Sequence, residues 1–454
     1  MNYREAIDFL YSRLPMFHRI GAAAYKADLN NTIELCALLG NPESYLNHRC
    51  IHIAGTNGKG SVSHMLAAIL QTAGYKTGLY TSPHLLDFRE RIRINGKMIS
   101  EQEVISFIEK YQKDFERINP SFFEWTVALA FNYFRQEKVD VAVIETGLGG
   151  RLDSTNVVTP LLSVITNIGL DHTNLLGNSY EQIAFEKAGI IKQHVPVVIG
   201  ETIAETKDIF QQKAKHENAE IIFADEKFTA VKIGSEENFI SLDILPSPPL
   251  PPLPGERGLS SAVSPSPKGE GLEVRRLQLD LTGDYQLKNI VTVIAAAENL
   301  KNHFAITENV LRDALKNVNG ITGLMGRWQI LKKEPLVICD VGHNAEGIAS
   351  VVEQIKKTRY DKLHFVFGMV EDKSADKILK LLPRDAEYYF CRANIPRAMD
   401  SETLTKQANE AGLKGKNYGS VKDAVNHALQ NASPTDFVFI GGSTFVVAEA
   451  LEYA

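Results

Sequence analysis

The chain has 454 residues, of which 44% are hydrophobic and 23% charged, and its formal net charge is −6 at pH 7. The length predicts two or three domains, and the composition is typical of a globular protein. The negative charge argues against nucleic acid as the main partner, and no apolar stretch reaches the roughly 18 residues that a membrane span needs.

The cysteines and the first residues indicate the compartment. The four cysteines stand at positions 36, 50, 339 and 391, far apart and without paired spacing. This spacing argues against a zinc site and favours a reducing compartment. The segment MNYREAIDFLYSRLPMF carries acidic and basic side chains early and has no long apolar run, so it does not read as a signal peptide. We therefore expect a cytoplasmic protein.

Residues 50–200 alternate short apolar runs with segments of helical periodicity, such as SVSHMLAAILQTAG and WTVALAFNYFRQEK. Strands rich in valine and isoleucine, with helices between them, predict a mainly parallel sheet that is covered on both faces. The expected strands are 50–55, 77–82, 140–146, 161–169 and 196–200. Two further helices, at 286–300 and 308–318, are expected to close this part of the chain.

The turn-rich segment NGITGLMGR (319–327) is followed by a second alternation of strands and helices. Its strand-like runs are PLVICDVGHN, KLHFVFGMV, AEYYFCRAN and DFVFIGGST. We therefore predict an N-terminal domain of residues 1–321 and a smaller α/β domain of residues 322–454. Ligands of such sheets bind at the carboxyl ends of the strands, and a cleft between two domains is the natural place for a second substrate.

One segment fits neither domain. Residues 245–273, LPSPPLPPLPGERGLSSAVSPSPKGEGLE, are dense in proline, glycine and serine and have almost no periodicity. The composition predicts a disordered surface insertion between two strands or beside a hairpin. The alternative is a polyproline ligand for a binding module, because prolines favour the extended conformation that such modules recognise.

The segment HIAGTNGKGS (52–61) leads from an expected strand into an expected helix. Backbone N–H groups of a glycine-rich loop, with a helix N-terminus behind them, form a cradle for phosphate. Lys59 adds a mobile positive charge, and Ser61 or Thr56 a hydroxyl for metal or phosphate. The strict pattern would need a glycine in place of Ile53, and here Gly60 separates the lysine from the serine. The alternative is a glycine-rich turn whose lysine is merely exposed.

Polar side chains follow three of the other expected strands. Glu145 ends DVAVIET, where a carboxylate can hold Mg²⁺ that bridges nucleotide phosphates, although a capped or solvated strand end is the alternative. The run ITNIGLDHT continues past Asn167 to His172, which either binds metal, caps a helix or carries protons, since histidine is an unusual Mg²⁺ ligand. Ser82 and His84 lie at the end of TGLYTS and could reach the same crevice.

Further polar residues lie in the helix FEKAGIIK and around the first strand of the second domain. Lys187 either extends its amine to solvent or, if it is desolvated near a metal, loses its charge or is modified. Asp340, His343 and Asn344 follow the strand, and Arg327 precedes it. These groups could contact a nucleotide from across the cleft, whereas a strand-end turn that satisfies its own hydrogen bonds is the alternative.

Taken in order, several segments resemble the bacterial folylpolyglutamate synthase/dihydrofolate synthase family: GTNGKGS, YTSPHL, FRERIRING, ETGLGGRLDSTN, LDHT, EKAGIIK, GR and DVGHN. This family belongs to the wider group of ATP-dependent amino-acid ligases that includes the muramyl ligases. The resemblance covers nearly the whole chain apart from the Pro-rich insertion. Muramyl ligases place threonine directly after the loop lysine and lack TSPHL and GGRLDSTN, so Gly60 is a mark of the folate family.

The resemblance implies an α/β fold, with an N-terminal P-loop NTPase-like, ATP-binding domain and a smaller C-terminal Rossmann-like, glutamate-ligase domain. It also implies functional residues. The catalytic residues would be Lys59, Glu145, His172 and Lys187, the last matching the family lysine that carries a carbamate. The ligands of Mg²⁺ would be Ser82, Glu145 and His172. ATP would bind Thr56, Asn57, Gly58, Lys59, Gly60, Ser61, Asn289, Arg327, Asp340 and His343. The pterin-bearing substrate would bind Ser121, Phe122, Phe123, Glu124, Leu152, Asp153 and Ser154.

The implied reaction is the ATP- and Mg²⁺-dependent addition of L-glutamate to dihydropteroate and to the γ-carboxylate of reduced folates, through an acyl phosphate. We expect a monomer with no nucleic-acid or membrane partner. Two segments depart from the family pattern, namely the Pro-rich insertion and the pterin-contact segment GAAAYKADL (21–29), which fits only loosely. The rival interpretations are a muramyl-type amino-acid ligase and a non-catalytic nucleotide-binding protein whose Pro-rich insertion binds a partner.

Overall fold

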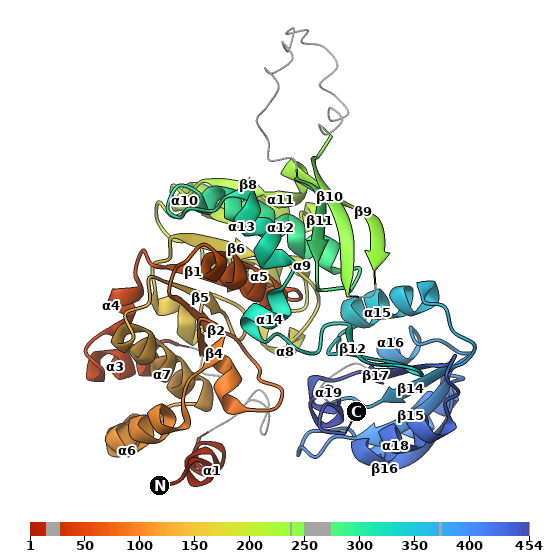
Figure 1. Ribbon diagram of the computed structural model, residues 1–454. Helices are drawn as coiled ribbons and strands as arrows, with labels where there is room; N and C mark the ends of the chain where they lie inside the picture. Colours follow the sequence, from red (N-terminus) through yellow and green to blue (C-terminus); the bar gives the residue numbers. More distant parts are fainter. Residues whose placement is uncertain (15–27, 237, 249–273, 372–374, 454) are drawn as a thin grey trace, which may run out of the picture.

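The computed structural model describes residues 1–14, 28–236, 238–248, 274–371 and 375–453. The expected Pro-rich insertion from residue 249 onward, and residues 21–27 of the expected pterin-contact segment, lie outside these ranges. Figure 1 shows two lobes, each built around its own sheet, with a small third sheet beside helix α12 of the first lobe. The chain passes from the first lobe to the second between helix α14 (Val318–Thr322) and strand β12 (Gln329–Lys333).

The sheet of the N-terminal lobe has eight strands in the order β4-β3-β2-β5-β1-β6-β7-β8. Its parallel strands are β1 (Cys50–Ala54), β2 (Thr77–Tyr80), β5 (Val141–Glu145), β6 (Leu162–Ile165), β7 (Val197–Ile199) and β8 (Ile221–Phe223). Two antiparallel strands, β3 (Ile92–Ile94) and β4 (Lys97–Met98), form one edge. The five predicted strands and the mainly parallel α/β sheet are confirmed. Because β1 pairs with β5, Ile53 lies opposite Glu145, and both strands end at the same edge.

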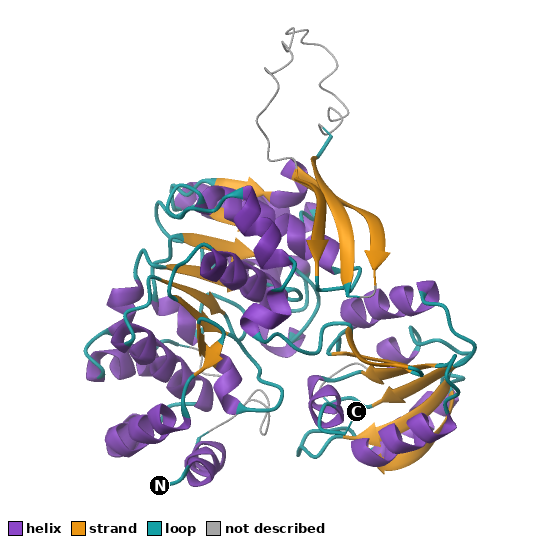
Figure 2. Ribbon diagram, viewed as in Figure 1, coloured by secondary structure: helices purple, strands orange, loops and turns teal. Residues whose placement is uncertain are grey.

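Helices cover both faces of this sheet, as Figure 2 shows. Alternate residues of β1 point to opposite faces: Ile51 and Ile53 pack against α5 (Lys59–Thr72) and α12 (Gln286–Leu300), whereas Cys50 packs with α7 (Phe122–Gln136). The first face is completed by α13 (Glu308–Leu315) and α14. The other helices are α1 (Tyr3–Arg13), α3 (Asn30–Leu38), α4 (Pro42–Leu46), α6 (Glu101–Ile118), α8 (Thr173–Leu176), α9 (Tyr180–Ala188), α10 (Ala204–His216) and α11 (Ala224–Lys227).

An antiparallel three-stranded sheet that the sequence did not predict lies beside α12. Its strands are β9 (Phe228–Glu236), β10 (Phe239–Pro246) and β11 (Val274–Leu279). Alternate residues of β10, Ile240, Leu242 and Ile244, are buried in the same core as α5 and α12. The Pro-rich insertion therefore joins two neighbouring strands, as expected, but its predicted start at residue 245 is wrong because β10 continues to Pro246.

The C-terminal lobe has six strands in the order β12-β13-β17-β14-β15-β16, of which only β12 is antiparallel to its neighbour. The remaining strands are β13 (Leu336–Asp340), β14 (Leu363–Phe367), β15 (Glu387–Arg392), β16 (Lys414–Ser420) and β17 (Phe437–Gly441). Two apolar clusters cover the two faces. They contain residues of α15 (Ala345–Lys357), α16 (Ala375–Leu379), α17 (Ser401–Glu410), α18 (Val421–Asn431) and α19 (Thr444–Ala450). In the segment 319–327, which was expected to be rich in turns, the first residues belong to α14.

The four cysteines are buried and free, in agreement with the absence of paired spacing. Burial raises the pKa of the Cys339 thiol to about 12, so this thiol is protonated at neutral pH. In the part of the chain that the structure describes, no helix is both long enough and apolar enough to cross a membrane.

Candidate active site

The loop between β1 and α5 has a backbone that requires glycine. Gly58 precedes the helix with φ of 84°, in the left-handed region. A Cβ atom at this residue would lie 2.3 Å from Oδ1 of Asn289. Helix α12, which carries that asparagine, therefore packs directly onto the loop. The strand–loop–helix order and the closeness of Asn289 agree with the predicted phosphate cradle, in which backbone N–H groups face an anion.

The residues that follow strand β6 hold the loop in place. The N–H of Asn57 donates a hydrogen bond to Oδ1 of Asn167 at 2.8 Å, and the hydroxyl of Thr166 donates to the carbonyl of Asn57 at 2.6 Å. The hydroxyl of Thr56 donates to the carbonyl of Gly169 and accepts from its N–H. The residues after β6 thus fix the loop before any ligand binds, which favours a preformed anion site.

Two lysines converge on one carbonyl of the loop. Nζ of Lys59 donates to the carbonyls of Gly55 at 3.0 Å and Thr56 at 3.2 Å, and Nζ of Lys187 donates to the same carbonyl of Gly55 at 2.8 Å. Only 3% of Lys187 is exposed, so the alternative that this lysine extends to solvent is wrong. Burial, and then the charge of Lys59, lower the pKa of Lys187 to about 7. The amine is therefore partly neutral at physiological pH and can act as a nucleophile.

Glu145 ends β5 beside this loop and is 3% exposed. One oxygen, Oε2, accepts a hydrogen bond from the N–H of Ser82 at 3.2 Å. Burial raises the pKa of Glu145 to about 7, although the charges of Lys59 and Arg327 oppose this rise. The alternative of a solvated strand end is wrong. A buried carboxylate with so high a pKa, at the edge of a phosphate loop, is the kind of group that a bound cation would keep ionised.

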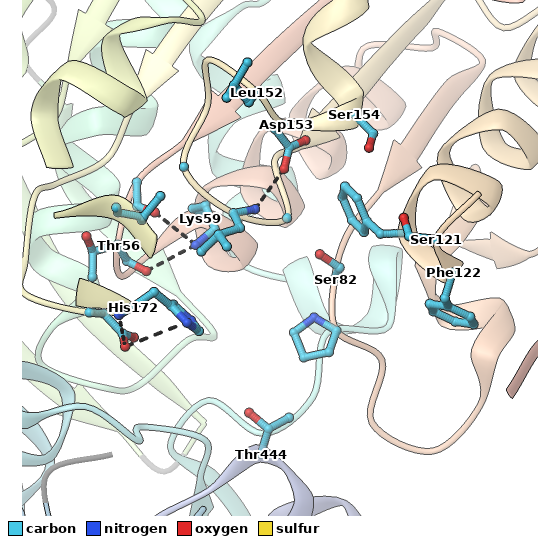
Figure 3. Close-up of a pocket in the computed structure, with 18 of the residues that line it drawn as sticks. Thr56, Lys59, Ser82, Ser121, Phe122, Leu152, Asp153, Ser154, His172 and Thr444 are labelled. Carbon is cyan, nitrogen blue, oxygen red and sulfur yellow. Dashed lines mark hydrogen bonds and ion pairs between the residues drawn. The ribbon is translucent and has the colours of Figure 1, made fainter. Parts of the chain in front are cut away.

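His172 occupies the residue before α8 with φ of 50°, but its side chain makes no capping hydrogen bond, so it does not act as a helix cap through its side chain. Its N–H donates to Oδ1 of Asp171 at 2.8 Å, and Nε2 lies 4.0 Å from the same oxygen. Figure 3 shows the imidazole at the edge of the cavity that Lys59 and Ser82 also line.

Among the described residues, no group of three or more His, Cys, Asp or Glu side chains could hold a metal ion. The set of Ser82, Glu145 and His172 contains only two such residues, and its role in metal binding stays a prediction. The set fits a cation that is bound mainly by phosphate oxygens and water, because Mg²⁺ commonly takes only one or two carboxylates from the protein. Ser82 and Glu145 line one common cavity, described below, and carry oxygen atoms of the kind that Mg²⁺ prefers.

The first of two adjoining cavities, with a volume of about 250 Å³, lies between α7 and the turn after β5. We call it the aromatic pocket, after the side chains of Phe122 and Phe123. All seven residues that were predicted to bind the pterin-bearing substrate line it: Ser121, Phe122, Phe123, Glu124, Leu152, Asp153 and Ser154. Figure 3 shows Ser154 and Phe122 on the side of this pocket away from His172. The predicted residues thus come together, but their contacts with a substrate stay a prediction.

Two of these residues also stabilise the start of helix α7. Ser121 and Glu124 form a capping box at the start of α7, in which the Ser121 N–H donates to Oε2 of Glu124 at 2.6 Å and the Glu124 N–H donates to the Ser121 hydroxyl.

His84, which was expected to reach the crevice, lines neither cavity. Its ring instead contacts the hydroxyl of Tyr11 at 3.1 Å and accepts from Nε of Arg91 at 2.7 Å.

The second cavity, of about 520 Å³, we call the phosphate-loop pocket. It is lined by all ten residues that were predicted to bind ATP: Thr56, Asn57, Gly58, Lys59, Gly60, Ser61, Asn289, Arg327, Asp340 and His343. The two cavities share Thr56, Lys59, Ser82, Pro83, His343 and Thr444. They therefore meet at the loop lysine, so a group bound in one cavity can react with a group bound in the other.

The carboxylate of Asp340 is engaged by the protein itself. Its oxygens accept from the hydroxyl of Tyr285 at 2.6 Å and from the N–H groups of Trp328 and Gly342, each at 2.7 Å. Burial raises the pKa of Asp340, and these donors oppose that rise. The alternative of a turn that satisfies its own hydrogen bonds therefore applies here. Asp340 holds the backbone next to Arg327, whose guanidinium approaches the loop: a Cβ on Gly60 would lie 3.2 Å from Nη2 of Arg327.

The C-terminal lobe closes directly over the loop. Nδ2 of Asn344 donates to Oδ1 of Asn57 at 2.9 Å and to Oδ2 of Asp171 at 3.2 Å, and Nδ2 of Asn57 donates to Oε2 of Glu346 at 3.2 Å. Nε2 of His343 lies 3.6 Å from Oδ2 of Asp171. Asn344 and His343 thus face the loop from across the cleft, whereas their contact with a nucleotide stays a prediction. Glu346 was not predicted, because only the packing of the two lobes brings it to the loop.

The C-terminal lobe also supplies one wall of the aromatic pocket through Val370, Arg397, Ser443, Thr444 and Phe445. Figure 3 shows Thr444 approaching Ser82 and Lys59 from this side. None of these residues was predicted from the sequence to line the cleft. The only available signal was that Ser443 and Thr444 follow the expected strand DFVFIGGST, at the carboxyl end where ligands of such sheets bind.

Two protein-family models match the chain: the Mur ligase middle domain over residues 53–297 and the Mur ligase glutamate ligase domain over residues 326–444. A dihydrofolate synthase/folylpolyglutamate synthase of Bacillus subtilis is 33% identical, with 98% of each chain covered. One of Escherichia coli is 30% identical, covering 88% of this chain and 85% of the relative. A probable bifunctional folylpolyglutamate synthase/dihydropteroate synthase of Haloferax volcanii is 31% identical over 99% of this chain, which spans 50% of that longer protein.

Solved structures agree with these relatives. A structure of Escherichia coli FolC in complex with DHPP and ADP superposes with a TM-score of 0.81 at 28% identity, covering 100% of this chain and 97% of that chain. A bifunctional folylpolyglutamate synthase/dihydrofolate synthase with Mn, AMPPNP and L-glutamate bound has a TM-score of 0.80 at 27% identity, covering 100% of this chain and 98% of that chain. A divalent metal, a nucleotide and glutamate thus bind to proteins of this fold.

Proposed function

The chain belongs to the folylpolyglutamate synthase/dihydrofolate synthase group of the Mur ligase family and is an ATP-dependent glutamate ligase, and from this premise we propose which parts of the cleft perform each step. The observation that carries the proposal is that the phosphate-loop pocket and the aromatic pocket meet at Lys59 and Ser82. The domains that we assign are an ATP-binding domain of residues 1–321 and a glutamate-ligase domain of residues 322–454.

ATP occupies the phosphate-loop pocket, with its phosphates against the loop and Lys59. This lysine now contacts the loop carbonyls of Gly55 and Thr56 and can exchange these neutral partners for phosphate oxygens. Arg327 and Asn289 approach the loop from two other sides. We assign Mg²⁺ to Ser82, Glu145 and His172, where it would neutralise charge on the phosphates. The titration of Glu145 near neutral pH supports this assignment.

The acceptor occupies the aromatic pocket. Phe122, Phe123 and Leu152 offer the apolar and aromatic surface that suits a flat pterin ring, and Asp153 and Ser154 offer polar groups at its edge. The acceptor's carboxylate then points to the junction at Lys59. For dihydropteroate this is the benzoate carboxylate, and for a reduced folate it is the γ-carboxylate of the terminal glutamate. We infer that both kinds of acceptor are used.

L-Glutamate enters from the side of the C-terminal lobe. Arg397 and the hydroxyls of Ser443 and Thr444 line this wall of the pocket, and a guanidinium with hydroxyl groups suits the binding of carboxylates. Thr444 lies at the junction of the two cavities, close to the place where the acceptor carboxylate would be activated. The position of the lobe therefore brings the glutamate amine to the activated carbonyl.

The reaction has two steps. An oxygen of the acceptor carboxylate attacks the terminal phosphorus of ATP in line, so that ADP leaves and an acyl phosphate forms. The neutral α-amine of glutamate then attacks the acyl carbon, phosphate leaves with its bridging oxygen, and the amine loses a proton. Lys59 stabilises the negative charge that develops in the first step. The contacts of Asn344 and Glu346 with Asn57 keep the cleft closed, which protects the acyl phosphate from water.

We assign a carbamate to Lys187. Its neutral amine attacks CO₂ and loses a proton, which gives an N-carboxylate in place of an ammonium group. Support comes from the burial of Lys187, from its pKa of about 7 and from the second positive charge nearby, on Lys59. The change of sign would relieve the repulsion between the two lysines and place an anionic group beside the metal.

A monomeric state and a cytoplasmic location stay predictions from the sequence.

Phosphate release with L-glutamate, ATP and Mg²⁺ tests the choice of acceptor. We expect turnover with dihydropteroate and with tetrahydrofolate, and none when glutamate or the acceptor is omitted. Turnover with only one acceptor would restrict the activity to that one. Lack of turnover with both acceptors, while ADP still binds, would contradict the assignment of the aromatic pocket and would return the muramyl-type ligase and the non-catalytic protein as explanations.

A further inference from the structure

A chain of three side chains leads from the centre of the first sheet to the wall of the aromatic pocket. His52, in the middle of β1, is fully buried. Its Nε2 lies 2.8 Å from the hydroxyl oxygen of Thr155, and this hydroxyl lies 2.5 Å from Oδ1 of Asp153. The proposed chemistry uses Asp153 only as a wall of the pocket and does not use His52. A buried histidine in an otherwise apolar strand is costly, so its retention calls for a physical explanation.

The direction of the hydrogen bonds follows from the groups around Asp153. Its carboxylate accepts from the N–H groups of Leu148 at 2.8 Å and Thr155 at 3.0 Å, and such donors favour the ionised form, although burial raises the pKa of Asp153. Both carboxylate oxygens thus act as acceptors toward backbone N–H groups, and the Thr155 hydroxyl likewise donates to Oδ1. The hydroxyl has only one proton, and therefore Nε2 of His52 must be the donor to Thr155.

The second nitrogen of His52 agrees with this direction. Nδ1 is buried and has no hydrogen-bond partner among the described residues. A protonated Nδ1 would be a buried donor without an acceptor, so the neutral ring carries its proton on Nε2. Burial lowers the pKa of His52 to about 3, so the ring stays neutral over the physiological range. The chain of donors thus has one orientation and ends on the carboxylate of Asp153.

Asp153 in turn determines where the pocket wall lies. Its bond to the Leu148 N–H spans the glycine-rich turn that follows β5. In the same turn, a Cβ on Gly147 would lie 2.4 Å from Cζ of Phe123, so the turn passes against that ring with no room for a side chain between them. The carboxylate, the turn and the aromatic side chain are therefore positioned together, and the bond from His52 through Thr155 fixes one end of this arrangement.

We propose that His52 is a positioning residue for the acceptor: acting through Thr155, it fixes the carboxylate of Asp153 and the turn that forms one wall of the aromatic pocket. This inference rests on the proposed assignment of that pocket to the pterin-bearing acceptor. His52 lines neither cavity, and Asp153, on which it acts, lines only the aromatic pocket. Removal of the His52 side chain should therefore weaken the binding of the acceptor and leave the binding of ATP unchanged.

Steady-state kinetics with His52→Leu and Thr155→Val test the proposal. We expect each variant to raise the KM for tetrahydrofolate by about tenfold or more, as is typical for the loss of a buried hydrogen bond to a charged group, with the KM for ATP within about twofold of wild type. His52→Gln, whose amide nitrogen can donate in place of Nε2, and Thr155→Ser should restore the KM. The double variant should be no worse than the worse single variant, because both substitutions break the same chain.

A matched control is His364→Leu. His364 is also fully buried, on β14 in the C-terminal lobe, and contacts the hydroxyl of Tyr389 at 2.9 Å and Oδ2 of Asp436 at 3.3 Å. The substitution His364→Leu should lower the melting temperature without changing the KM for the acceptor. If His52→Leu does not fold, Thr155→Val decides alone, since valine has nearly the shape of threonine.

The proposal is overturned if Thr155→Val binds the acceptor as wild type does, if the KM for ATP rises in parallel, or if Thr155→Ser fails to restore the KM. The failure of the pocket assignment would look different, because the wild-type protein itself would then not turn over the pterin-bearing acceptor.

Discussion

Glu145→Gln should lower ATP-dependent glutamate ligation by about a thousandfold or more, since it removes the charged group assigned to the metal that stabilises the transferring phosphate. The buried carboxylate lies at the end of β5 beside the phosphate loop, and the substitution keeps its size. Phosphate release at saturating substrates measures the effect. Asp436→Asn is the matched control, because Asp436 is also buried but precedes β17, at the end of that strand opposite the cleft.

The same substitution should not destabilise the fold. Burial raises the pKa of Glu145 from 4.5 to about 7, so the folded protein binds the proton more tightly than the unfolded chain does. Stability from this group is therefore present below pH 4.5 and lost as the pH rises through 7. At pH 8, without nucleotide and metal, Glu145→Gln should melt at the same temperature as wild type or higher. Near-normal activity in this variant would refute the metal assignment, whereas lost activity with lost folding would leave Glu145 a structural residue.

Lys187→Arg should lower the ligation rate by about 10–100-fold or more, as expected for a group that orients a metal site. Arginine keeps the positive charge but cannot form a carbamate. In the wild-type protein, removal of CO₂ should lower the activity and bicarbonate should restore it. Because only the neutral amine reacts and the pKa of Lys187 is lowered to about 7, recovery at a fixed concentration of dissolved CO₂ should be faster at pH 8 than at pH 6.

Chemical rescue separates the carbamate from other roles of Lys187. Acetate or formate should restore part of the activity of Lys187→Ala, since the small anion can occupy the space of the missing carboxylate, and should not restore Lys187→Arg. Lys192→Ala is a suitable control, because Lys192 is a partly buried lysine whose pKa is also lowered by burial, and its amine donates to the carbonyl of Asn156. Full activity of Lys187→Arg in the absence of CO₂ would contradict the carbamate.

The local pattern of the sequence was enough to predict five of the eight strands of the first sheet and the residues at its carboxyl edge, but not the edge strands β3, β4 and β8. In a parallel sheet the strand ends meet at one edge, so the loop after β1 and Glu145 after β5 had to lie near each other, and the pairing of Ile53 with Glu145 confirms this. The burial of Lys187 could not be predicted in the same way, because it depends on how α9 packs against the loop and not on the spacing of apolar residues.

Three features were beyond the reach of local patterns. Strand β16, KGKNYGS, has almost no apolar residue and forms only because β15 offers an edge for pairing. The sheet of β9, β10 and β11 is interrupted by the Pro-rich insertion. The contributions of Arg397 and Glu346 to the cleft depend on the closure of one lobe over the other. The hydrogen bonds that the Asp340 carboxylate accepts from Tyr285, Trp328 and Gly342 likewise depend on tertiary packing, and its implied contact with ATP stays a prediction.

In the proposed reaction, the acceptor carboxylate is phosphorylated where the two cavities meet, and the amine of glutamate then attacks the acyl phosphate. The most direct measurement is the mass of the phosphate released when both carboxylate oxygens of the acceptor are ¹⁸O. We expect one ¹⁸O atom in each phosphate and one in the new amide carbonyl. Unlabelled phosphate, released at the same rate as the product forms, would rule out an acyl phosphate.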